Sequence, residues 1–128
     1  MRLPPGFNTV TAYFFVNDAN AYIDFLVKGL GGVEVMRHKN GDHITNAQVR
    51  LGESTVMVSE ASTEYPAMQS AHYLYVDDAD ASMNMALSAG AISIMEVENM
   101  PYNDRQGGIK DSHGNIWWLS ERLVEGPY

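Results

Sequence analysis

The sequence predicts an α+β fold made of two tandem βαβββ modules. Three observations predict it: a length that suits one domain, an internal repeat at an offset of about sixty residues, and in each copy one helical pattern followed by three short strand patterns. Single domains typically hold ~100–150 residues. The chain has 128 residues, of which 45% are apolar, so it can bury a core of its own.

The internal repeat is clearest near the start of each half. Residues 13–21 and residues 73–81 are identical at five of nine positions, and most of the other positions are conservative. Residues 30–36 then match residues 89–95 after a slip of one residue. Because these matches occur in the same order in both halves, duplication explains them better than chance.

The first copy reads as one helix and four strands. Val10, Ala12, Phe14 and Val16 alternate with more polar or aromatic residues, which is typical of a strand with two different faces. Asp18 follows as a helix N-cap, and apolar residues then recur at helical spacing. We therefore predict a helix at 19–30 and three further strands at 33–37, 44–51 and 55–59.

The second copy repeats the pattern. It predicts a strand ending near Val76, a helix at 79–89, and strands at 92–97, 107–110 and 115–120. We expect one domain over residues 1–128, with module one at about 8–60, a Pro-containing linker at 61–70 and module two at about 71–122.

Composition excludes several classes of function. The chain carries 16 acidic and 8 Lys or Arg side chains, a net charge of −8, which argues against nucleic acid or an anionic membrane as a partner. It contains no cysteine, so a disulfide framework, a thiolate metal site and a Cys nucleophile are all excluded. No signal-like or membrane-spanning apolar run is present, and we expect a cytoplasmic protein.

A distinctive motif lies near the end of the second copy. Asp104-Arg105-Gln106-Gly107 precedes a turn, residues 111–115, with the pattern Asp-x-x-Gly-Asn, and Trp117-Trp118 follows. Together with the two βαβββ modules, this stretch resembles the glyoxalase/bleomycin-resistance/extradiol dioxygenase superfamily, also called vicinal oxygen chelate. The resemblance covers about residues 10–121. It implies curved mixed sheets around a cavity and a homodimer, but it leaves lyases, transferases, dioxygenases and non-catalytic binders all possible.

The resemblance also implies where a metal would lie. Metal-dependent members carry ligands at one position on the first and one on the last strand of each module. The corresponding residues here are Thr11, Met57, Ala71 and Trp118. None of these side chains is an ordinary ligand of a divalent metal, so we expect no metal site and no cofactor. A register shift of one residue would place His72 at a ligand position, but without partners.

Strand alternation predicts what lines the cavity instead. The residues expected to face inward are mostly aromatic, with a thioether and two amides, a composition that suits a small-molecule pocket. They are Tyr13, Phe15, Asn46, Gln48, Met57, Tyr73, Tyr75 and Trp118. Arg105 is added as a possible anchor for an anionic ligand, with a structural ion pair as its alternative. No residue is nominated as catalytic.

The leading interpretation is a metal-independent small-molecule binding protein. It would resemble the bleomycin-resistance proteins and sequester a mostly apolar or cationic drug or metabolite, as in antibiotic resistance. The alternatives are a metal-dependent glyoxalase-like lyase or extradiol dioxygenase, and a structural homodimer whose cavity has closed.

Overall fold

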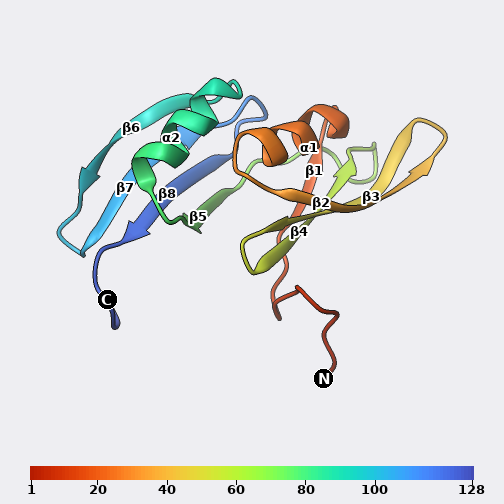
Figure 1. Cartoon of the computed structure of the whole chain (residues 1–128). Helices are drawn as coiled ribbons and strands as arrows, with labels where there is room; N and C mark the ends of the chain where they lie inside the picture. The colour runs from red at the N-terminus through yellow and green to blue at the C-terminus, as the bar shows by residue number, and fades with distance from the viewer. The chain divides into compact units, whose positions relative to one another are not determined.

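The computed structural model describes all residues from Met1 to Tyr128, and the chain divides into two compact units, Met1–Met68 and Gln69–Tyr128. Each unit contains one helix and one four-stranded mixed sheet (Figure 1). The predicted α+β fold of two βαβββ modules is therefore confirmed. No helix combines the length and the apolar character needed to cross a membrane.

The first unit has the connectivity that the repeat predicts. Its elements are β1 (Tyr13–Val16), α1 (Ala19–Lys28), β2 (Val33–Asn40), β3 (His43–Leu51) and β4 (Ser54–Glu60). The strand order is β1-β4-β3-β2, with β1 parallel to β4 and the other neighbours antiparallel. The crossover from β1 to β4 therefore leaves β1 and β2 as the sheet edges.

The second unit repeats this topology. Its elements are β5 (Ala71–Tyr75), α2 (Ala79–Ser88), β6 (Ile92–Asn99), β7 (Asp104–Lys110) and β8 (Ile116–Arg122). The order is β5-β8-β7-β6, and β5 is parallel to β8. Tyr13 pairs with Met57 in the first sheet and Tyr73 pairs with Trp118 in the second, so the two tyrosines occupy equivalent places.

Both helices begin in the same way. The carboxylates of Asp18 and Asp78 accept hydrogen bonds from backbone amides of the first helical turn, as predicted for N-caps. A glutamate from the last strand of each unit adds a second cap. Glu60 accepts from the amides of Asp18 and Ala19 at 2.9 Å each, and Glu121 accepts from the amide that opens α2 at 3.0 Å. The last strand therefore anchors the helix that covers the same sheet.

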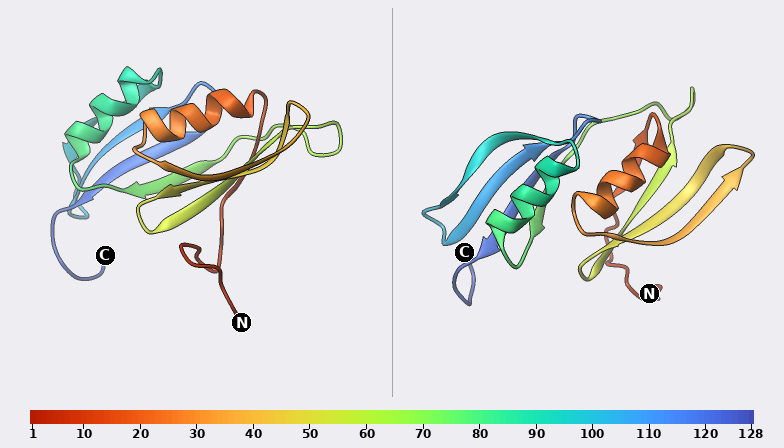
Figure 2. Two further views of the ribbon diagram at one scale, coloured as in Figure 1. Left: turned by 45° about the vertical axis from the view of Figure 1, so that its right-hand side comes forward. Right: turned by 45° about the horizontal axis from the view of Figure 1, so that its top comes forward.

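Each sheet has one face covered by the helix of its own unit, as both views in Figure 2 show. The covered face of the first sheet carries the buried apolar side chains, and Tyr22, Ile23 and Leu26 of α1 pack against them. The opposite face, here called the helix-free face, carries the residues of the other parity. This alternation is what places aromatic and polar side chains together away from the helix.

Several boundaries differ from those predicted. The helices end at Lys28 and Ser88, two and one residues early. Gly31, at φ 74°, adopts a left-handed conformation that closes the end of α1. Strand β7 starts at Asp104, three residues before the predicted start. The prediction missed these three residues because Asp104 to Gln106 are polar and lack the apolar alternation of a strand.

Candidate functional site

The helix-free face of the first unit brings five of the predicted residues together. Register places Tyr13, Met57 and Gln48 in one row across β1, β4 and β3, and Phe15 and Asn46 lie beside them. The Asn46 amide donates to the Tyr13 hydroxyl at 3.4 Å, and the Gln48 amide donates to Asn46 at 3.5 Å. These hydrogen bonds are long, so both amides keep capacity for a further partner.

A hollow of about 380 Å³ opens beside this row. The Phe15 ring, which lines the hollow, lies 4.9 Å from the ring of Tyr13 and is stacked on the ring of Tyr65 at 5.5 Å, centroid to centroid. The hollow is lined by Tyr13, Phe15, His43, Thr45, Ser59, Glu60, Ser62 and Tyr65. Its volume lies at the lower end of the ~300–1,000 Å³ range of small-molecule pockets. Tyr65 lies in the segment predicted to be the linker, and no strand alternation could place it on this face.

The helix-free face of the second unit is more polar. Tyr73 and Trp118 are neighbours in register, and the Trp118 ring lies against Gly108 of β7. A Cβ at Gly108 would meet this ring at 2.5 Å, so glycine is required for the close approach. Tyr75 is more than half exposed further along the same strand. The three predicted residues of this unit thus share one face.

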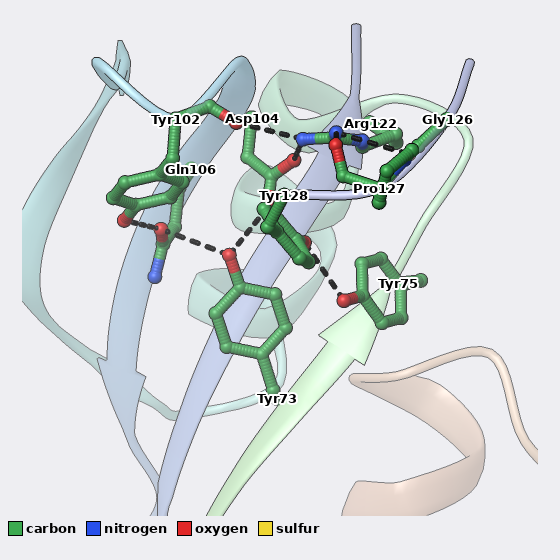
Figure 3. A network of polar contacts seen from close by, with 9 residues as sticks. All are labelled: Tyr73, Tyr75, Tyr102, Asp104, Gln106, Arg122, Gly126, Pro127 and Tyr128. Carbon is green, nitrogen blue, oxygen red and sulfur yellow. Dashed lines mark hydrogen bonds and ion pairs between the residues drawn. The ribbon is translucent and has the colours of Figure 1, made fainter. Parts of the chain in front are cut away.

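A hydrogen-bond network centres on Asp104 of β7 (Figure 3). The carboxylate has no exposed surface. One oxygen accepts from the hydroxyls of Tyr73 at 2.5 Å and Tyr128 at 2.6 Å, and the other accepts from Arg122 at 3.0 Å. Gln106 accepts from the hydroxyl of Tyr102, and its side-chain oxygen lies 3.3 Å from the Tyr73 hydroxyl, whose single proton is directed mainly at Asp104. Sequence reasoning missed Asp104 and Gln106, although both have the same parity on β7 and the opposite parity to Arg105.

These partners keep Asp104 ionised. Burial alone would raise the pKa of the carboxyl, but hydrogen bonds from Tyr128, Tyr73 and Arg122, with the charge of Arg122, outweigh it and hold the pKa below its usual range. Conversely, burial and the hydrogen bond to Asp104 raise the pKa of Tyr73. The same carboxylate raises the pKa of the Tyr128 hydroxyl. At neutral pH both phenols are therefore protonated donors to a carboxylate.

Tyr128 reaches this carboxylate from outside the sheet. Its ring lies over the Arg122 guanidinium, 4.2 Å from guanidinium carbon to ring centroid, and its hydroxyl also contacts Tyr75 at 2.7 Å. Arg122 in turn donates to the backbone carbonyls of Gly126 and Pro127. A second hollow, of about 330 Å³, opens next to these side chains. It is lined by Tyr75, Val76, Asp77, Glu121 and Arg122.

Arg105 lies elsewhere. Its guanidinium forms a two-pronged ion pair with Asp80 of α2, at 2.8 and 3.1 Å, and donates to Asn99 at 3.0 Å. It therefore faces the helix, whereas Asp104 and Gln106 face Tyr73. The structural ion pair, the alternative that the sequence left open, is the one observed.

The residues present do not fit the metal site of the metal-dependent members. Thr11 hydrogen-bonds to a backbone carbonyl, Ala71 has no donor, and Met57 and Trp118 offer a thioether and an indole. Nowhere in residues 1–128 do three His, Asp or Glu side chains gather closely enough to hold a metal. His72 stacks on Trp117 at 4.8 Å, on the helix side as strand alternation predicts. Burial there lowers the pKa of His72, partly offset by the charge of Asp111.

The fold defines a class of protein, the two-module βαβββ proteins, and in each module one sheet face is free of the helix of its own unit. Within it, residues 6–119 match the model of the Glyoxalase/Bleomycin resistance protein/Dioxygenase superfamily, so the chain belongs to this superfamily. An uncharacterized protein of Mycobacterium bovis is 29% identical, over 91% of this chain and 84% of its own length.

Two solved structures share the fold at low identity. TioX from Micromonospora sp. ML1 has a TM-score of 0.77 at 21% identity, covering 91% of this chain and 99% of its own. TnmS3, described as an antibiotic binding protein from Streptomyces sp. CB03234, has a TM-score of 0.70 at 21% identity, covering 90% and 97%.

Proposed function

We propose that the protein binds and sequesters a mostly apolar, aromatic or cationic small molecule without a metal, in the manner of bleomycin-resistance proteins. One observation carries the proposal. In each unit the sheet face opposite the helix presents half-exposed aromatic side chains with a few polar groups, instead of the closed apolar packing of the covered face. Apolar walls with a few placed polar groups are typical of small-molecule sites.

Electrostatics and the fold relatives favour the same class of ligand. The net charge of −8 attracts cations, and the faces of Tyr and Trp rings hold planar or cationic guests. TnmS3, which shares this fold, is described as antibiotic binding. That description supports a binding function for this chain without naming its ligand.

We also propose that the protein is a homodimer. The edge strands β2 and β6 expose apolar side chains at equivalent places of the repeat. In a monomer these side chains and the open sheet edges would be in contact with water, which an interface with a second copy would prevent. These side chains are Val33, Val35, Ile92 and Ile94, each between 42% and 60% exposed. Light scattering at micromolar concentration should give twice the chain mass of 14.2 kDa, and a clean monomer mass would contradict the proposal.

A thermal-shift screen of aromatic compounds tests the binding function. Neutral and cationic planar compounds should raise the melting temperature, because a ligand at about a hundredfold excess over its Kd stabilises the folded state by about 2.7 kcal/mol. For any compound that binds the second unit, Trp118→Ala should weaken binding by about 1–3 kcal/mol, the scale of a lost aromatic contact. Arg105→Ala is the control, because Arg105 faces α2. If no aromatic compound raises the melting temperature, the proposal fails.

A further inference from the structure

The Tyr128 side chain is largely exposed, but it contacts Asp104, the most deeply buried charged side chain of its unit. Its side chain is 68% exposed, yet its hydroxyl donates to Asp104, which has no exposed surface. An exposed aromatic ring on a chain segment is normally free to move, whereas this ring is held at three points, by Asp104, Tyr75 and Arg122. In the rest of the segment the backbone carbonyls of Gly126 and Pro127 accept from Arg122, whereas the side chains of Leu123 and Val124 are exposed.

The receiving groups belong to the sheet and not to the segment. Asp104, Tyr73 and Tyr75 lie on β7 and β5, and Arg122 ends β8. Tyr73 and Arg122 hold Asp104 through contacts that do not involve Tyr128. Removing the Tyr128 side chain would therefore leave an ionised carboxylate, an exposed phenol and a guanidinium plane facing the same space.

We propose that this space is a binding site for phenolic aromatic compounds and that Tyr128 is its built-in, displaceable occupant. The inference rests on the proposed binding function and names a ligand class for the second unit. The hollow of about 330 Å³ beside Tyr75 and Arg122 gives room for the part of a ligand larger than one ring.

The chemistry of the three contacts selects a phenol over other aromatics. Its hydroxyl hydrogen replaces the donor to Asp104, its oxygen accepts from Tyr75, and its ring lies on the Arg122 guanidinium. An amine would also pair with Asp104, but its charge would stand next to Arg122. A benzoate would be repelled by Asp104. A ring without a hydroxyl leaves one lone pair of the carboxylate without its donor.

Ser120 adds a further polar group at this place. Its side chain is fully buried on β8, next in register to Tyr75 and Gln106. Its hydroxyl has no hydrogen-bond partner of ordinary geometry. It lies near the Tyr73 hydroxyl and lowers the pKa of that phenol, against the larger effects of burial and Asp104, which raise it. This hydroxyl therefore keeps unused hydrogen-bonding capacity beside the proposed site.

The test uses p-cresol, which is the tyrosine side chain as a free molecule, and toluene, which lacks the hydroxyl. Binding is measured in wild type, Tyr128→Ala and Val124→Ala, with the side-chain NMR signal of Arg122 as the local reporter. Tyr128→Ala should bind p-cresol about tenfold more tightly than wild type does. The same variant should bind p-cresol about tenfold more tightly than toluene, because about tenfold is the scale of one hydrogen bond to a charged group. Val124→Ala, in the same segment, should behave as wild type.

Two results would overturn the inference: equal p-cresol affinity in Tyr128→Ala and wild type, or equal affinity of Tyr128→Ala for p-cresol and toluene. An unchanged indole N–H signal of Trp117, which is buried in the core of the second unit, establishes that this unit is folded in the variant. If Tyr128→Ala gains no p-cresol site while compounds from the thermal-shift screen still bind, the phenol site is wrong and the binding function stands. If the p-cresol site appears but no compound of the screen binds wild type, the sequestering function alone is wrong.

Discussion

Replacing the two adjacent tryptophans of β8 by alanine should have clearly different effects on stability. Trp117 is 2% exposed, its ring stacks on His72 at 4.8 Å, and its indole N–H donates to Asp111 at 3.1 Å. Trp117→Ala therefore opens a cavity in the core and removes a hydrogen bond to a carboxylate. Truncations of this kind cost about 3–5 kcal/mol.

Trp118 points to the other face of the same strand. It is half-buried against Gly108, so its truncation removes less contact and leaves an opening that water can fill. We expect Trp118→Ala to cost about 1–2 kcal/mol, from the smaller apolar area that it covers. Urea denaturation of both variants measures the difference, and Trp117→Phe, which keeps most of the volume, should fall between them. A larger loss for Trp118→Ala than for Trp117→Ala would refute the assignment of the two faces.

Three further predictions concern charge and metal. The pKa of Asp104 is lower in the folded state than the ~3.9 of the unfolded chain, so its ionisation stabilises the fold above that pH and the contribution disappears as the pH falls through the folded pKa. The stability gap between wild type and Asp104→Asn should therefore be largest at neutral pH and narrow in acid; a gap independent of pH would contradict this. Arg105→Ala removes an exposed ion pair with Asp80, so it should shift the urea midpoint little and leave ligand affinity unchanged. A marked loss of ligand affinity would instead indicate that Arg105 contacts the ligand. Elemental analysis of protein purified without chelators or affinity tags should find no stoichiometric divalent cation, and one ion per chain would favour the lyase or dioxygenase alternative.

The fold could be predicted because its signals are local and occur twice. Alternation in residues 13–16, the N-cap Asp18 and its copy Asp78 each depend on neighbours in the sequence, and the repeat allowed every element to be predicted twice. The expected strand start at Val10 was wrong, because β1 begins at Tyr13 and Val10 is 86% exposed. Strand parity also placed the aromatic residues of each unit on one face, because the side-chain period of two follows from the backbone alone. That the residues of both units border one cavity stays a prediction.

The network around Asp104 could not be predicted because its contacts join residues that are far apart in the sequence. A buried carboxylate is acceptable only when partners satisfy it, and here they are Tyr73, Arg122 and Tyr128, between 18 and 31 residues away. Nothing local indicates that Asp104 is buried, since Asp104-Arg105-Gln106 is polar throughout. The one available signal was parity. Once Arg105 is paired with the helix, Asp104 and Gln106 must face the other side.

The most direct test of the account follows the two indole N–H signals of wild type by NMR while a compound from the thermal-shift screen is added. The chain contains only two tryptophans, so Trp118→Phe assigns both signals. A ligand bound on the helix-free face of the second unit should shift the signal of Trp118 and leave that of Trp117, which is buried and bonded to Asp111, in place. A bound ligand that shifts Trp117 and not Trp118 would contradict the account.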